Sequence, residues 1–194
     1  MFLAAIGDHT IDVDRLAGGF VLDAGCRNFY FAQHLNMMGC NVIAVDADPT
    51  VEAPKDFKGV FANVALATEG GERNFLMHDN PEARHLVRDG VFSFPTAKVQ
   101  AVTLADVMAF YKIEHWDVVK LDIEGAEYEI LQTWQGPIAT QISVEFHEHC
   151  APRPPEVYDG ILKHLGQWYD VVQHEKTARH FTSPNYWDSL WTLK

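Results

Sequence analysis

The sequence predicts an α/β fold, a doubly wound and mostly parallel seven-stranded sheet with helices on both faces and an antiparallel last strand. Two observations indicate this class. Short apolar runs typical of buried strands alternate with segments of helical spacing along the chain. The last two strand candidates, 169–173 and 187–193, are joined by a segment too polar for a crossover helix, so we expect them to be antiparallel.

The first elements form a βαβ unit. An apolar strand over 20–23 ends at Gly25, a helical pattern follows and stops at Gly39, and a second strand covers 41–45. This order predicts a parallel pair of strands. An extended segment over 59–66 comes next, before a double glycine that is typical of a tight turn.

The later elements continue the alternation. Thr103 and Asp106 have the spacing of a capping box, which predicts the start of a helix. The remaining expected elements are a strand over 116–121, a helical stripe that stops at Gly136, a strand over 141–146 and a helix over 157–168.

We expect one domain over residues 1–194. Residues 1–18 read as a short N-terminal extension. Residues 77–100 are too long for a simple connection and are interpreted as a lid or substrate loop.

The net charge and the cysteine content of the chain exclude some classes of partner and compartment. The net charge of −12 disfavours nucleic acid and anionic membranes, because phosphate binding needs a surface rich in Lys and Arg. The three cysteines have no paired spacing, which favours reduced thiols. No apolar run approaches membrane-spanning length, and the apolar start is too short for a signal segment. The expected location is cytoplasmic, and the oligomeric state is not predicted.

The segment 118–127 is the most informative part of the chain. Lys120, Asp122, Glu124 and Glu127 crowd the end of a strand that should be buried, where their charges need partners, a metal or a ligand. In open α/β sheets this end of the strands is the ligand crevice. The alternative is that Asp122 and Glu124 only cap the following helix.

Two earlier acids indicate a nucleoside site. Asp23 precedes the turn at Gly25, and Asp46 follows the second strand at about the spacing of a ribose-binding acid. The glycine pattern that cradles a pyrophosphate is absent, which makes a NAD-type oxidoreductase the weaker alternative.

Taken in order, several motifs resemble those of FkbM-type methyltransferases. They are Val21-Leu-Asp-Ala-Gly25, Asp46-Ala-Asp-Pro49, Asn63-Val-Ala-Leu66, Leu104-Ala-Asp106, Lys120-Leu-Asp-Ile-Glu-Gly-Ala-Glu127 and Tyr186-Trp-Asp-Ser-Leu190. These enzymes have the Rossmann-like class I fold and use S-adenosylmethionine. The resemblance therefore implies methyl transfer to an oxygen of a small molecule or glycan.

The resemblance also implies roles for single residues. Asp23, Gly25, Asp46 and Asn63 would bind the cofactor, with Asp46 on the ribose hydroxyls. Asp122 and Glu124 would face the transferred methyl group and the acceptor.

His147 joins Asp122 and Glu124 as a candidate base, because a hydroxyl acceptor must lose its proton as the new bond forms. Strand alternation would place Glu145, His147 and His149 on one face. With Asp122 they are candidate ligands of a divalent cation, although ten histidines in one chain also cluster by chance.

Phe29 departs from the family pattern, which has a second glycine at this position. Its ring could turn into the core, lie on the adenosine, or fill the site. The last outcome would favour a degenerate domain that binds without catalysis.

Overall fold

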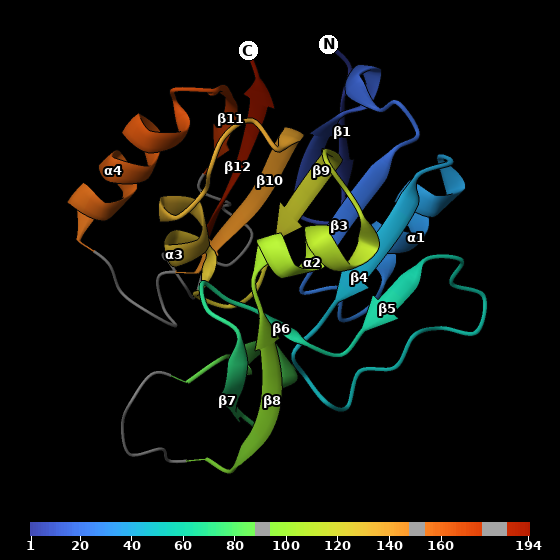
Figure 1. Ribbon diagram of the computed structural model, residues 1–194, viewed down its shortest axis with the longest axis vertical. Helices are drawn as coiled ribbons and strands as arrows, with labels where there is room; N and C mark the ends of the chain where they lie inside the picture. Colours follow the sequence, from blue (N-terminus) through green and yellow to red (C-terminus); the bar gives the residue numbers. More distant parts are fainter. Residues whose placement is uncertain (88–93, 148–153, 176–185) are drawn as a thin grey trace.

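The computed structural model describes residues 1–87, 94–147, 154–175 and 186–194, and a seven-stranded sheet lies at its centre (Figure 1). The strand order is β11-β12-β10-β9-β3-β4-β5. The bounds are β3 Phe20–Ala24, β4 Asn41–Val45, β5 Val60–Ala62, β9 Trp116–Leu121, β10 Ala139–His147, β11 Tyr169–Glu175 and β12 Tyr186–Leu193. The predicted α/β class is confirmed. The sheet is mixed, because β12 runs antiparallel to both of its neighbours.

The two faces of the sheet are covered differently. Helices α2 (Leu104–Tyr111), α3 (Glu127–Gln132) and α4 (Pro155–Leu165) pack into one apolar core on the first face. On the second face α1 (Tyr30–Met37) packs beside an N-terminal hairpin. Helices therefore occur on both faces as predicted, but a β-hairpin takes much of the second face. The predicted capping box of α2 is present, with Thr103 and Asp106 exchanging hydrogen bonds.

Residues 1–18 form regular secondary structure, whereas we expected only a short extension. They form strands β1 (Leu3–Ile6) and β2 (His9–Asp12), followed by the short helix η1 (Val13–Arg15). Gln141 of β10 fixes this hairpin, since its side chain accepts a hydrogen bond from the Asp12 amide at 2.8 Å and donates one to the Asp12 carbonyl at 3.1 Å. The hairpin residues Ile6 and Ile11 are buried in the apolar core on this face.

A second, three-stranded sheet lies beyond the carboxyl ends of the parallel strands (Figure 1). Its order is β6-β8-β7, with β6 Ala65–Leu66, β7 Gly71–Leu76 and β8 Thr96–Val102. Two expectations were wrong here. The extended segment 59–66 divides between β5 and β6, and the end of the irregular segment 77–100 is strand β8, whose alternate residues Val99 and Ala101 are buried.

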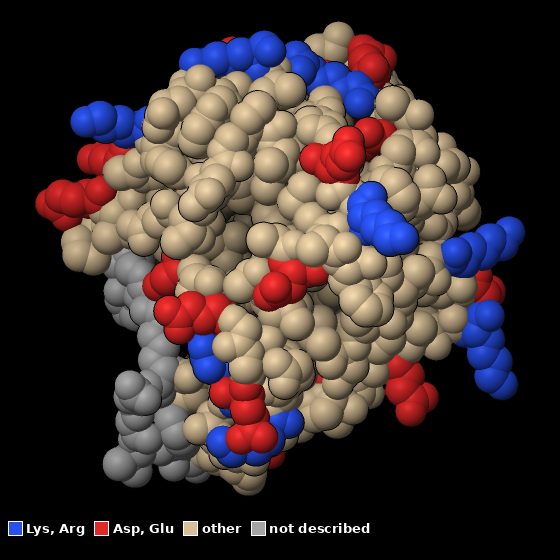
Figure 2. Space-filling view, in the orientation of Figure 1, with Lys and Arg blue, Asp and Glu red and all other residues tan. Residues whose placement is uncertain are grey.

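The surface shows no segregation of charge on the face in Figure 2, where acidic and basic side chains are interspersed among uncharged ones. Within the described ranges, none of the helices combines the length and apolar character needed to cross a membrane.

Candidate active site

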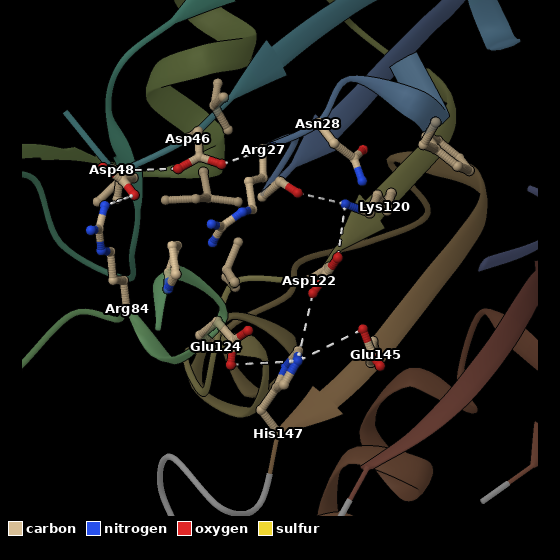
Figure 3. Close-up of a pocket in the computed structure, with 18 of the residues that line it drawn as sticks. Arg27, Asn28, Asp46, Asp48, Arg84, Lys120, Asp122, Glu124, Glu145 and His147 are labelled. Carbon is tan, nitrogen blue, oxygen red and sulfur yellow. Dashed lines mark hydrogen bonds and ion pairs between the residues drawn. The ribbon is translucent and has the colours of Figure 1, made fainter. Parts of the chain in front are cut away.

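A cavity of about 470 Å³ opens at the carboxyl ends of β3, β4, β9 and β10 (Figure 3). The turn of the N-terminal hairpin and the segment around η2 (Pro81–Ala83) complete its walls. This is the crevice where open α/β sheets bind ligands.

Gly25 forms the sharp turn after β3. Its φ of +80° is in the left-handed region, and a Cβ atom at this position would collide with the carbonyl oxygen of Asp122. The Gly25 amide donates to the Val45 carbonyl at 2.9 Å. The turn is therefore held between the ends of β4 and β9, and its backbone lines the cavity.

Phe29 turns away from the cavity. It is 1% exposed, and its ring packs edge-on against Phe57 and Phe61 with centroids 5.0 and 5.2 Å apart. The backbone keeps the left-handed conformation, with φ of 58°, that a glycine would adopt most easily. Of the three outcomes left open by the sequence, the ring turning into the core is the one found.

Asp46 follows β4 and forms part of the cavity wall. Its carboxylate accepts hydrogen bonds from the amides of Arg27 at 2.9 Å and Asp48 at 2.8 Å. Burial raises the pKa of Asp46, and these two amide donors offset part of that rise. Asp46 is therefore a fixed hydrogen-bond acceptor in the cavity wall, beside the Gly25 turn.

Asn63 holds the backbone of Asp46 by hydrogen bonds. Its side-chain amide donates to the carbonyls of Asp46 at 3.0 Å and Asp48 at 2.7 Å. Asp48 in turn pairs with Arg84 at 2.8 Å. This ion pair ties the segment around η2, which lies inside the expected lid, to the loop after β4.

Asp23 and Lys120 form a buried pair beneath the cavity. Asp23 accepts a hydrogen bond from the Ala32 amide in the first turn of α1 at 3.1 Å, and Lys120 Nζ lies 3.0 Å from its other oxygen. Lys120 also contacts the Gly25 carbonyl at 2.8 Å and Asp122 at 3.1 Å. Burial acts to lower the pKa of Lys120, but Asp122 and Asp23 raise it well above its ordinary value. The structure places this cation in the cavity wall.

Asp122 is the point where the polar groups converge. Its side chain is 26% exposed and lies 3.1 Å from Lys120 and 3.6 Å from His147 Nε2. Burial acts to raise the pKa of Asp122, but Lys120 and the nearby histidines hold it well below its usual range. Asp122 is thus an anion that faces the cavity.

Glu127 fixes two of the candidate catalytic residues, Glu124 and His147. This fully buried acid, in the first turn of α3, accepts hydrogen bonds from the amides of Ile123 and Gly125, both at 2.9 Å. It also lies 2.8 Å from His147 Nδ1. The loop of Glu124, whose φ is 56°, and the ring of His147 are therefore fixed by one carboxylate.

His147 faces three carboxylates with its other nitrogen. Nε2 lies 3.6 Å from both Asp122 and Glu124 and 3.7 Å from Glu145 (Figure 3). Burial acts to lower the pKa of His147, but Glu127 and the other acids raise it to about 10. Burial and the charge of Asp122 raise the pKa of Glu145 to about 8.

The structure thus gathers the three predicted catalytic residues, Asp122, Glu124 and His147, at one end of the cavity. Of the predicted cofactor residues, Gly25 and Asp46 line the cavity, whereas Asp23 and Asn63 hold the loops that carry them. Glu145 joins the cluster as its place on the strand suggested. His149 lies outside the described residues.

His9 is the component that the sequence did not reveal. It comes from β2 of the hairpin and is 3% exposed, with Nδ1 3.1 Å from Ser143 Oγ and Nε2 3.5 Å from Asp122. Burial lowers the pKa of His9. No local signal in residues 1–18 marks it, because only the docking of the hairpin brings it to the site.

The sequence profile described as the methyltransferase FkbM domain matches residues 23–175. No curated protein matches the chain.

Solved structures give more distant likenesses. A TehB-like SAM-dependent methyltransferase from Corynebacterium glutamicum is 13% identical with a TM-score of 0.49, over 91% of this chain and 81% of that one. Magnesium protoporphyrin IX methyltransferase from Synechocystis, solved with bound SAM, is 14% identical with a TM-score of 0.48, over 90% and 69%.

Proposed function

The chain belongs to the FkbM methyltransferase family, and from this premise we propose that it transfers a methyl group from S-adenosylmethionine to a hydroxyl oxygen of a small molecule or glycan. The observation that carries the proposal is the position of Asp46. Its carboxylate faces a cavity at the carboxyl ends of the strands, beside the Gly25 turn, at the place of a ribose-binding acid.

The cavity suits the proposed cofactor. Its volume of about 470 Å³ is within the range of about 300–1,000 Å³ typical of small-molecule sites. Because the Phe29 ring packs into the core, it leaves the loop backbone free to approach the nucleoside. In this scheme Asp46 binds the ribose hydroxyls and Gly25 lies along the methionine part.

Asp23 and Asn63 act as positioning residues in this scheme. Asp23 holds the first turn of α1 and Lys120, and Lys120 holds the Gly25 carbonyl. Asn63 fixes the backbone of Asp46. Both affect the cofactor through the loops that they support.

The acceptor is expected at the other end of the cavity, against Asp122, Glu124 and His147. The methyl carbon forms a bond to the acceptor oxygen as its bond to the sulfonium sulfur breaks, giving S-adenosylhomocysteine and a methyl ether. The hydroxyl proton passes to Glu124, because Lys120 and the histidines lower the pKa of Asp122 and make it a poor base. His147, a cation near neutral pH, balances these acids, and the fixed cluster positions the oxygen for in-line attack.

Calorimetric titration with S-adenosylmethionine and S-adenosylhomocysteine tests the cofactor. We expect both to bind the wild-type chain. Asp46→Ala should weaken binding about 10-fold or more, since a hydrogen bond to a charged group contributes about 1.5–3 kcal/mol. Asp56→Ala is the matched control, because this acid is exposed and lies outside the cavity wall.

The outcomes separate the alternatives. No binding of either compound at about 1 mM would overturn the enzyme proposal and favour a binding module without catalysis. Unchanged affinity in Asp46→Ala would refute the ribose role of this residue. Binding of NADH in preference to both compounds would favour the oxidoreductase alternative.

A further inference from the structure

His9 has a nitrogen that the proposed reaction does not use. The ring is buried, and among the described residues Nε2 has no hydrogen-bond partner. Its neighbour is a carboxylate oxygen of Asp122, 3.5 Å away. A buried ring nitrogen without a hydrogen bond is costly unless a ligand or an ion completes it.

The groups around this nitrogen have the composition of a metal site. His9 offers Nε2, while Asp122 and Glu145 each offer a carboxylate oxygen, and these three atoms all lie within 4.8 Å of one another. They come from three elements: β2, the end of β9 and β10. Each of these residues also lines the cavity.

Contacts outside the trio fix the orientation of His9 and Asp122, as is usual for metal ligands. The Nδ1 atom of His9 is 3.1 Å from Ser143 Oγ, which sets the orientation of the ring and leaves Nε2 directed at the acids. Lys120 holds Oδ2 of Asp122, the oxygen that faces His9, at 3.1 Å. A metal-binding histidine ordinarily has such a partner on its second nitrogen.

A second trio, Asp122, Glu124 and His147, has the same spacing. There Nε2 of His147 already has ion-pair partners at 3.6–3.7 Å. Among the described residues, Nε2 of His9 contacts one carboxylate, Asp122 at 3.5 Å, whereas Nε2 of His147 contacts three, and this difference favours the first trio as the site.

We propose that His9, Asp122 and Glu145 bind one divalent transition-metal cation at the acceptor end of the cavity. One imidazole and two carboxylates suit Mn²⁺ or Zn²⁺ better than Mg²⁺ or Ca²⁺, which prefer oxygen ligands alone. Three protein ligands leave coordination positions open toward the cavity. In the proposed methyl transfer, and resting on that proposal, the cation holds the acceptor oxygen beside the methyl donor.

Calorimetric titration of the full-length chain, stripped of metal by dialysis against a chelator, tests the site with Mn²⁺ and Zn²⁺ alone. We expect one cation per chain. His9→Ala and Glu145→Gln should each weaken binding by more than about 10-fold, and Ser143→Ala by about 10–100-fold, since loss of an outer partner has an effect of that size. His115→Ala is the matched control, because this histidine is exposed and bonds Thr140.

Circular dichroism of each variant in chelator establishes that it is folded. Should His9→Ala fail to fold, Glu145→Gln and Ser143→Ala still test the site from β10. No binding of either cation at about 1 mM, or equal affinity in the wild type and in the folded ligand variants, would overturn the proposal.

The affinity for S-adenosylhomocysteine in chelator separates this proposal from the preceding one. If that compound binds and neither cation does, the metal site is refuted and the methyl-transfer proposal stands. If Mn²⁺ and Zn²⁺ each bind at His9 and S-adenosylhomocysteine does not bind, the metal site stands without methyl transfer.

Discussion

Replacing Gly25 by alanine should destabilise the protein more than replacing any glycine whose surroundings are open. Gly25 has a left-handed backbone, and its absent side chain leaves room for the carbonyl oxygen of Asp122. A methyl group there would push the turn after β3 away from the end of β9. Both segments are walls of the cavity, so we also expect weaker binding of S-adenosylhomocysteine.

Two costs add up in this substitution. An L-residue in the left-handed region costs about 1–2 kcal/mol. Forcing an extra methyl group against fixed backbone costs about 1–3 kcal/mol more. The free energy of unfolding should therefore fall by about 2–5 kcal/mol, a large part of the 5–15 kcal/mol typical of a domain.

Gly39→Ala and Gly136→Ala are the controls. Both glycines have positive φ, 88° and 76°, and no atom lies within 4 Å of the position that a Cβ would occupy. They carry only the backbone cost. Urea unfolding at neutral pH measures all three variants, and a Gly25→Ala loss equal to that of the controls within about 0.5 kcal/mol would refute the collision with Asp122.

Three further predictions test the neighbouring contacts. Glu127→Gln removes the charge that most raises the pKa of His147, so an NMR titration should show that pKa falling well below its value of about 10; an unchanged titration would contradict the coupling. Phe29→Gly relieves a strained φ but empties a core position, so urea unfolding should show a net loss of about 2–4 kcal/mol with cofactor affinity unchanged. A large drop in that affinity would place the ring in the cofactor site instead. Burial acts to raise the pKa of Asp48, but hydrogen bonds from Thr50 and Arg84 lower it, so its ionised form stabilises the fold. Arg84→Gln should therefore lower stability above pH about 4, with a difference that shrinks as the pH falls below that value; the same deficit at every pH would argue against the ion pair.

The parts of the fold that depend on local pattern were predictable. The apolar run of β9 ending in Asp122 placed the acids at the carboxyl edge of the sheet, and Thr103 with Asp106 marked the start of α2. The strand β8 was missed although exposed Lys98 and Gln100 alternate with buried Val99 and Ala101, because its partners lie in a separate small sheet.

The remaining parts of the site depend on tertiary contacts. His9 reaches the cluster because Gln141 docks the hairpin on β10, and no property of residues 1–18 taken alone specifies that docking. The direction of the Phe29 ring likewise depends on Phe57 and Phe61, which lie beyond the next strand. Sequence periodicity predicts which face of a helix or strand is buried, but it does not predict which other element packs against that face.

A crystal structure of the chain with S-adenosylhomocysteine tests the central claim most directly. The account predicts the ribose hydroxyls within hydrogen-bond distance of the Asp46 carboxylate, the homocysteine part along the Gly25 turn, and the sulfur directed toward Asp122 and Glu124. A nucleoside bound outside this cavity, or a ribose turned away from Asp46, would contradict it.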